Sequence, residues 1–513
     1  MNRTTMSLLA ALVALAAVTG FAAIRPDDTD ISTLEQRLPR PVERTALTCP
    51  RPTAAESATT WYTAFTPGPA GAEEDYTSSE EPGSAALLPA AEYEPGTEGE
   101  ETEESGETEE SEDPAEAEPV VPLEEPGVPA AARVTDADAP ALTGTAEARL
   151  APGWTVQQTT SVTVGTGAGL LGTSCQTPDT EFWFTGASTA ESRADYVHIT
   201  NPDEAATVVD IGLYGPEGRL ETDLGQGITV PGGATVPIRL STLTDEPQTN
   251  LAVQVTARTG RVGALIEAVD EQLGADWLPP ADAPPGPLVI PGIPADAGTV
   301  RLTVFAPGDE DVTFDVGLAG ANGTIAPAGY ETVSVHAGTL TAIDLENLTR
   351  GEAGSLVLTP ASGSGGGAVV AAARVTLGED GEQDMAFIPA TAPVDRRATV
   401  SGNTTSGTEL SLVAPSEAVE VDVTVSPGTE GGESVTETYT VDGRTTLTFA
   451  PELPESTDGT YAVTLRTNGG PLYASRALTG DEDAPGLTIQ TLPDDRSTVT
   501  VPETRPELAV LMD

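Results

Sequence analysis

The residue types that most often carry out chemistry are scarce in this chain. It has two cysteines, Cys49 and Cys175, and two histidines, His198 and His336. No third metal ligand stands near either histidine, so the sequence gives little support to a zinc site. No G-x-S-x-G motif provides the nucleophile of a Ser-His-Asp hydrolase. We therefore interpret both histidines as ordinary strand residues, and we assign no catalytic residue, no cofactor and no metal ligand.

The two cysteines suggest a structural role. An even number of cysteines in an exported chain predicts a disulfide bond. A bond between Cys49 and Cys175 would close a long loop, which the loop-entropy model values at up to about 4–5 kcal/mol. The alternative is a pair of free, buried thiols. Catalytic thiol chemistry is less consistent with the sequence, because no histidine lies near Cys175.

Residues 167–172 match the G-x-G-x-x-G pattern of dinucleotide-binding proteins, and Asp195 follows at a suitable distance. Such a site requires a helix that opens at the glycines and holds the pyrophosphate at its N-terminus. The next residues, 173–178, read Thr-Ser-Cys-Gln-Thr-Pro and cannot open a long amphipathic helix. The pattern therefore predicts a hairpin turn rather than a nucleotide site.

Carboxylates are abundant, so residue type alone does not exclude the paired-carboxylate chemistry of glycosidases. Aromatic residues that stack on sugars are few, and we interpret Phe182, Trp183 and Phe184 as an inward-facing core strand. The acidic loops at 308–311 and 481–483 contain oxygen ligands that Ca²⁺ accepts, but neither has the spacing of an EF-hand.

The composition limits the partners that the chain can have. The formal net charge is −57, and all 23 basic residues are arginine. Binding to nucleic acid needs clustered basic residues that release counterions, and no such cluster occurs here. The acidity also argues against adsorption on an anionic membrane surface. An arginine-only, alanine-rich composition is typical of a GC-rich genome.

The N-terminus predicts export. After Arg3, residues 4–24 carry no charge and are rich in Leu, Ala and Val. About 20 apolar residues can span a bilayer as a helix. We expect residues 1–25 to be an uncleaved single-pass anchor or, alternatively, a signal peptide cleaved near residues 20–22. The bulk of the chain would then be extracytoplasmic, attached to the cell membrane or secreted.

An acidic stretch interrupts the chain after a first linker at 26–66. Between Glu73 and Glu125 there are 21 acidic residues among Gly, Pro, Ser, Thr and Ala. High charge and low hydrophobicity cannot offset the entropy lost on ordering. We expect residues 67–133 to be a disordered, self-repelling insertion.

The remaining sequence repeats. Short alternating segments that begin at Val209, Phe314 and Val421 recur at offsets of 105 and 107 residues, each followed by a Gly-rich turn. Period-two alternation predicts half-buried strands, and a fixed period of this size predicts tandem domains. We expect an all-β chain of Ig-like β-sandwich modules at 181–280, 286–380 and 384–480, with a C-terminal tail at 481–513.

A degenerate fourth copy can be drawn at the N-terminal side. Residues 169–174 resemble the end of a repeat, and residues 48–50 can supply a first strand. The module would then combine part of 26–66 with 134–180, and the acidic tract would be inserted between these parts. In this arrangement Cys49 and Cys175 lie on its first and last strands.

Several segments together resemble a family of uncharacterised actinobacterial secreted or membrane-anchored proteins. The resemblance rests on Pro41-Val42-Glu43-Arg44, Thr48-Cys49-Pro50, Pro152-Gly153-Trp154-Thr155, Gly172-Thr173-Ser174-Cys175, residues 195–202 and residues 491–496. It covers nearly all of the chain except the acidic tract. The resemblance implies an envelope location and paired cysteines, but no activity.

These observations lead to two functional hypotheses. The first is a non-enzymatic extracytoplasmic envelope protein that displays tandem modules for structural or binding roles. Its partners would be cell-wall polysaccharide or another envelope protein. The second is an accessory or hydrolytic module that acts on cell-wall glycans.

Overall fold

The structure is a computed structural model that describes residues 39–68, 83–93, 118–135, 139–222, 224–283, 286–361, 367–378, 383–454, 457, 459–480 and 485–500. The chain divides into two units, and nearly all described residues belong to the unit Pro41–Ser497. The expected N-terminal helix at 1–25 lies outside the described residues. Within the described part, no helix could span a bilayer.

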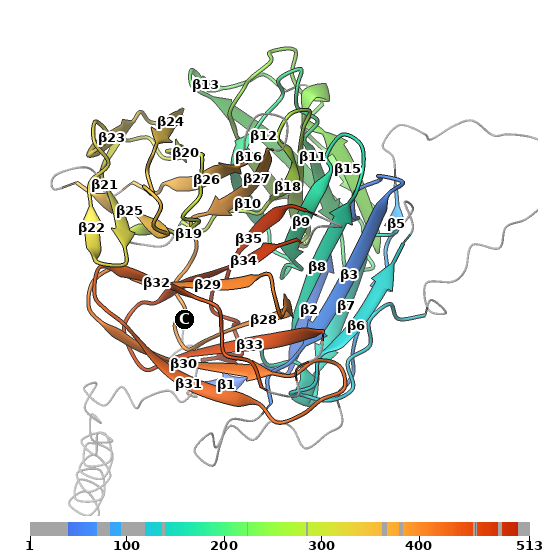
Figure 1. Cartoon of the computed structure of the whole chain (residues 1–513). Coiled ribbons are helices and arrows are strands. Elements are labelled where there is room, and N and C mark those ends of the chain that lie inside the picture. The colour runs from blue at the N-terminus through green and yellow to red at the C-terminus, as the bar shows by residue number, and fades with distance from the viewer. Residues whose placement is uncertain are drawn as a thin grey trace, which may run out of the picture. The chain divides into compact units, whose positions relative to one another are not determined.

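The expectation of an all-β protein is confirmed for the described residues (Figure 1), where the only helices are two 3₁₀ turns, η1 (Ala148–Leu150) and η2 (Leu240–Thr242). The strands group into four modules. The first module contains β2 (Arg44–Cys49), β3 (Ala58–Phe65), β4 (Ala85–Pro89), β6 (Ala130–Val134), β7 (Leu142–Glu147), β8 (Thr155–Val162) and β9 (Gly169–Ser174). The second contains β10 (Glu181–Ala187), β11 (Tyr196–Thr200), β12 (Thr207–Gly215), β13 (Gly218–Arg219), β14 (Ile228–Val230), β15 (Ala234–Arg239), β16 (Leu251–Ala257), β17 (Gly263–Asp270) and β18 (Gly274–Leu278).

The last two modules follow the same plan. The third contains β19 (Leu288–Ile293), β20 (Thr299–Phe305), β21 (Val312–Gly320), β22 (Gly323–Ile325), β23 (Thr332–Val335), β24 (Leu340–Glu346), β25 (Gly354–Pro360), β26 (Val370–Leu377) and β27 (Asp384–Pro389). The fourth contains β28 (Arg397–Thr404), β29 (Thr408–Ala414), β30 (Val419–Ser426), β31 (Val435–Val441), β32 (Thr445–Phe449), β33 (Thr460–Thr467), β34 (Tyr473–Thr479) and β35 (Leu487–Thr491). A separate ladder joins β1 (Arg40–Pro41) to β36 (Thr498–Val499).

Every module consists of two antiparallel sheets with one strand order. We count seven main strands in each module in chain order, leaving out the short strands β5, β13, β14, β22 and β23 and the edge strand β31. One sheet, called sheet I, orders its main strands first, fifth, third: β2-β7-β4, β10-β16-β12, β19-β25-β21 and β28-β33-β30. The other, sheet II, runs seventh, sixth, second, fourth: β9-β8-β3-β6, β18-β17-β11-β15, β27-β26-β20-β24 and β35-β34-β29-β32. A separate apolar core is shared by the two sheets of each module.

The repeat predicted from sequence is confirmed at the third main strand. Val209, Phe314 and Val421 occupy equivalent places on β12, β21 and β30, and all three are buried in the cores of their modules. The residues two positions further on, Ile211, Val316 and Val423, are buried as well. The aspartates between them are partly or fully exposed, because successive side chains of a strand point to opposite faces.

The predicted fourth copy is present as the first module, but the acidic insertion is shorter than expected. Within 67–133, strand β4 pairs with β7, and β5 (Ala91–Glu92) pairs in parallel with β15 of the second module. Strand β6 begins at Ala130 and pairs with β3. Disorder is therefore the wrong prediction for 83–93 and 118–133, because apolar residues such as Leu87 and Leu123 reach the core. The rest of the tract lies outside the described residues.

The expected module boundaries also require correction. Strand β27 lies within the predicted third repeat at 384–480, but it pairs with β26 and completes the module before it. Strand β35 lies within the expected tail at 481–513, yet it pairs with β34 and completes the fourth module. The similar segments that end each repeat are the sixth strands, and a less similar seventh strand follows each of them.

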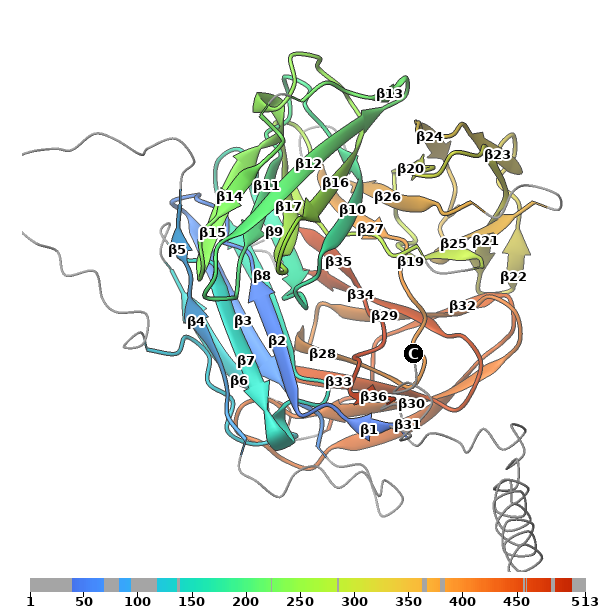
Figure 2. The same cartoon turned by 180° about the vertical axis from the view of Figure 1, so that it is seen from behind.

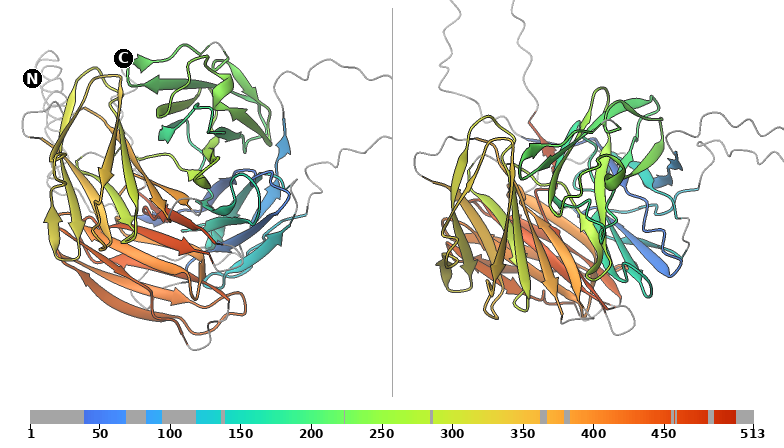
Figure 3. Two further views of the ribbon diagram at one scale, coloured as in Figure 1. Left: turned by 45° about the horizontal axis from the view of Figure 1, so that its top comes forward. Right: turned by 90° about the horizontal axis from the view of Figure 1, so that it is seen from above.

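Contacts between modules close the unit Pro41–Ser497 into a ring (Figures 1 and 2). The seventh strands meet in a circuit, in which β9 contacts β18, β18 contacts β27, β27 contacts β35, and β35 contacts β9. The first strand of each module packs on sheet II of the next: β2 on β17, β10 on β26, and β19 on β34. The fourth module continues this pattern, because β28 packs on β3 and β8 of the first. Figure 3 shows the orange fourth module beside the blue first module.

Candidate functional site: the closure of the module ring

A buried carboxyl group lies where the seventh strands meet. Asp276 on β18 accepts hydrogen bonds from the backbone N–H of Gly172 on β9 at 3.1 Å and from the hydroxyl of Thr488 on β35 at 3.1 Å. The three residues come from the second, first and fourth modules. Burial raises the pKa of Asp276 well above its usual value, so the group is held toward its neutral form. A side chain at Gly172 would collide with Thr488 and Gln490, which explains the glycine there.

A second carboxyl group marks the same junction on the third module. Asp384, the first residue of β27, accepts the backbone N–H of Leu487 on β35 at 2.6 Å and that of Met385 at 2.9 Å. Burial raises the pKa of Asp384 to about 7. The loss of hydration destabilises the charged carboxylate by more than the two N–H donors stabilise it. Asp384 also lines a pocket of about 370 Å³ together with Asp296 and Glu409.

A buried arginine fixes the inner strands of the fourth module. Arg476 on β34 donates from Nε and Nη2 to the side-chain oxygen of Gln490, at 2.9 and 2.6 Å. Its Nη1 donates to the carbonyl of Ser401 at 2.8 Å and to Asn403 at 3.1 Å. These acceptors are all neutral, and burial lowers the pKa of Arg476 to about 9. The network holds β28 and β35 against β34.

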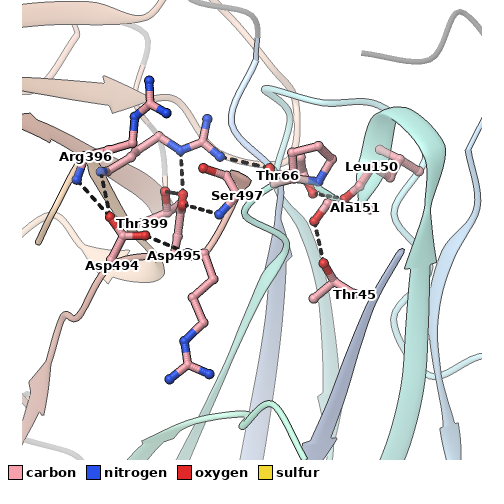
Figure 4. A network of polar contacts seen from close by, with 12 residues as sticks. Thr45, Thr66, Leu150, Ala151, Arg396, Thr399, Asp494, Asp495 and Ser497 are labelled. Carbon is pink, nitrogen blue, oxygen red and sulfur yellow. Dashed lines mark hydrogen bonds and ion pairs between the residues drawn. The ribbon is translucent and has the colours of Figure 1, made fainter. Parts of the chain in front are cut away.

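The seam between the fourth and first modules is closed by a second arginine (Figure 4). Arg397, at the start of β28, forms an ion pair with Asp495 through Nε and donates from Nη2 to the carbonyl of Pro152 at 2.9 Å. Asp495 also accepts the hydroxyl of Thr399 at 3.2 Å and the backbone N–H of Ser497 at 3.1 Å. The pair is largely buried, so its hydrogen bonds must be complete to offset desolvation.

Neighbouring contacts extend this seam. Asp494 accepts the backbone N–H of Arg396 at 2.8 Å, and the hydroxyl of Ser401 donates to the carbonyl of Thr63 at 2.6 Å. Gly153 has a φ of +78° and lies against the side chains of Arg397 and Asp495. A Cβ at this position would clash with both groups and would be strained in the left-handed region. The seam therefore depends on a glycine in the first module.

The disulfide predicted from the cysteine count is present. Cys49 is the last residue of β2, Cys175 follows β9 directly, and their Sγ atoms are bonded with Cα atoms 4.4 Å apart. The bond joins sheet I to sheet II of the first module, on its first and last strands. Reciprocal backbone hydrogen bonds between Thr48 and Gln176, at 2.9 and 2.8 Å, flank it.

The histidines are not brought together. His198 lies on β11 with Nε2 3.4 Å from Glu267, and its ring packs edge-on to Trp277. His336 is not a strand residue as predicted, because it follows β23 in a turn, where Nδ1 contacts Asp311 at 3.0 Å. In the described part of the chain, no group of three His, Cys, Asp or Glu side chains could hold a metal ion.

The other candidate motifs have structural roles where they are described. Residues 167–172 form the β8–β9 hairpin and the start of β9, as expected, rather than a helix N-terminus. Phe182 and Phe184 face the core of the second module, but Trp183 faces outward and packs on Phe305 of the third at 5.2 Å between ring centroids. In the loop at 308–311, Asp311 is engaged by His336 and by the backbone of Ala337. The acidic loop at 481–483 lies outside the described residues.

Several residues of the ring closure lie in segments that carry the family resemblance, but the sequence does not predict that they are in contact. Pro152, Gly153 and Gly172 stand in segments of the first module that carry the family resemblance, and Asp494 and Asp495 stand in the last such segment. The signal was the joint occurrence of these short segments outside the repeats. Arg397, Arg476 and Asp276 had no recognisable signal, because an isolated charged residue in a strand is usually a solvated one.

Comparison with protein families shows that residues 130–452 match a family of unknown function, DUF5719. The match covers more than half of the chain. The chain belongs to this family. The DUF5719 match begins at β6 and ends shortly after β32, so it contains the second and third modules entirely but only parts of the other two. No curated protein and no solved structure matches the chain.

Proposed function

We propose that this protein is a non-enzymatic extracytoplasmic envelope protein whose ring of modules serves as a structural or binding surface. The ring closure carries the proposal. Arg397 of the fourth module is paired with Asp495 and donates a hydrogen bond to Pro152 of the first module, and these contacts are largely buried. This arrangement favours one rigid body over four flexibly tethered domains, and rigid bodies present surfaces at little entropic cost.

The proposed location is supported by two features. The Cys49–Cys175 disulfide favours an oxidising compartment, because cytosolic thiols are kept reduced. The uncharged residues 4–24 favour a single-pass anchor or a secretion signal at the N-terminus. The arginine-only composition supports an actinobacterial origin. Partners of this surface would be cell-wall polysaccharide or another envelope protein.

Each module is further proposed to be an Ig-like β-sandwich at the level of architecture. Support comes from two antiparallel sheets around one core within roughly 100 residues. The strand order is not that of immunoglobulin domains, in which the first, second, fourth and fifth strands share a sheet. Here the first strand lies in sheet I, the second in sheet II and the third in sheet I again.

A reporter fusion tests the location. Alkaline phosphatase fused to the C-terminus of the full chain should be active, since that enzyme matures only where its disulfides form. The same fusion lacking residues 1–24 is the control and should be inactive. An inactive full-length fusion that is nevertheless stably produced would contradict an extracytoplasmic position.

The binding role is tested with the purified protein and isolated cell-wall material. Retention on the insoluble wall without release of soluble sugar supports the proposal. Release of reducing sugar would support the alternative, a hydrolytic module. If the protein is not retained and no sugar is released, envelope proteins remain as the partner class. The corresponding experiment immobilises the protein and tests capture of a defined envelope protein. The wild type should capture this protein and the Arg397→Met variant should not.

A further inference from the structure

A pocket of about 450 Å³ opens at one end of the second module. Its walls are the loop between β10 and β11 and the segment from η2 to the loop before β16. The inner residues are Thr189, Arg193, Ser241 and Thr244. This volume is within the range of about 300–1,000 Å³ that is usual for small-molecule sites.

The lining of the pocket includes a buried, oriented arginine, Arg193. The Arg193 side chain is only 3% exposed, and its Nε and Nη2 each donate to the carboxylate of Asp195 at 2.9 Å. Asp195 is fixed in turn by the backbone N–H of Ser188 at 2.8 Å, and the guanidinium lies near the ring of Phe387. Within the described part of the chain, no hydrogen bond occupies Nη1 of Arg193, which leaves this donor for a ligand.

Two hydroxyl groups also line this pocket, those of Ser241 and Thr244. The Thr244 oxygen accepts the backbone N–H of Glu246 at 3.2 Å, so its proton remains to be donated. The Ser241 hydroxyl has no hydrogen-bond partner in the described residues and can donate or accept. Hydroxyl groups with this freedom suit a ligand that itself carries several hydroxyls.

The charges around the rim select among ligands. Glu191 and Asp245 line the opening, where they would repel an anion, while Arg239 would repel a cation. A neutral ligand with vicinal hydroxyls is compatible with both the acidic and the basic side chains, because its hydroxyls donate to the carboxylates and accept from the guanidinium. We propose that this pocket binds a neutral sugar residue.

This inference rests on the proposed binding role and specifies the chemistry of its partner. The sugar could be free or the end of a wall polysaccharide. The test is calorimetric titration of the full chain with galactose, arabinose and glucose and with their neutral oligosaccharides. Galacturonic acid is the anionic control and glucosamine the cationic control. Binding of at least one neutral sugar, with weaker binding of both charged ones, is the expected result.

Two variants locate the binding. Ser241→Phe places a large side chain at the lining of the pocket and should abolish the heat of binding. Thr229→Phe places the same side chain at an exposed position of β14 in the same module and should change nothing. The melting temperature of each variant shows whether it is folded. An oligosaccharide that binds better than its monomer indicates a polysaccharide end, and equal affinity indicates a free sugar.

Three outcomes would overturn the proposal: no binding of any neutral sugar, tighter binding of galacturonic acid or glucosamine, or binding that a folded Ser241→Phe variant retains. These outcomes are separate from failure of the proposed function. The activity of the alkaline phosphatase fusion does not depend on this pocket, and neither does capture of an envelope protein by the immobilised ring.

Discussion

Arg397 donates a hydrogen bond from Nη2 to the carbonyl oxygen of Pro152 at 2.9 Å, across 245 residues of sequence. The same guanidinium is paired with Asp495, so one side chain joins the start of the fourth module, its C-terminal end and the first module. This contact closes the seam between the fourth module and the first.

Removal of this arginine should weaken the whole ring. Arg397→Met leaves the Asp495 carboxylate buried without its cation, which costs about 3–5 kcal/mol in comparable buried pairs. Arg301→Met is the matched control, because Arg301 and Asp344 form an exposed pair worth about 1 kcal/mol or less. Urea unfolding measures both free energies. Equal losses in the two variants would contradict the role assigned to the seam.

Reduction of the disulfide should destabilise the first module. The bond closes a separation of 126 residues, for which the loop-entropy model gives at most about 5 kcal/mol. We expect a reductant to lower the midpoint of urea unfolding. The Cys49→Ser/Cys175→Ser variant should begin at the lower midpoint and show no response to reductant. An unchanged midpoint in the reduced wild type would show that the bond carries no stability.

Adjacent residues of β21 should respond oppositely to substitution. Phe314 is buried in the core of the third module, so Phe314→Asp places an unpaired charge there and should unfold the module. Asp315 is exposed and accepts the hydroxyl of Thr332 at 3.2 Å, which an asparagine oxygen can also do. Asp315→Asn should therefore change stability by about 0.5 kcal/mol or less. Limited proteolysis distinguishes the two, and similar cleavage of both variants would contradict the assigned faces.

Asp384 should make stability fall as the pH rises. Its carboxyl group has a pKa near 4 in an unfolded chain, whereas burial raises the pKa to about 7 in the folded protein. The folded state thus binds the proton more tightly. Its stabilisation is complete below the unfolded pKa and is lost as the pH rises through the folded pKa.

The measurement is the melting temperature of the wild type and of Asp384→Asn over this pH window. Asp195, with its pKa raised to about 6, acts in the same direction, so only the difference between the two curves reports on Asp384. We expect the variant to lose less stability with rising pH. Parallel curves would show that Asp384 titrates normally.

The strands and their faces could be predicted from the sequence because their signal is local. Val209 and Ile211, with Asp210 between them, show the period of a strand within three residues, and equivalent triplets at Phe314 and Val421 show the repeat. The two cysteines predicted the disulfide because only one pairing exists. The acidic insertion is shorter than predicted, because Leu87 and Leu123 lie in short apolar runs between acidic residues. Their burial depends on the pairing of β4 with β7, which is distant in sequence.

By itself the sequence determined an all-β chain, its tandem modules, the paired cysteines and the outward aspartates, since composition and alternation depend on neighbouring residues. The tertiary structure alone decided which sheet each strand joins, that the seventh strands meet, and that Arg397 reaches Pro152 and Asp276 reaches Thr488. These contacts join residues hundreds of positions apart. They arise from the packing of complete modules, and no local pattern of residue types specifies which distant backbone or carboxyl group will be the partner.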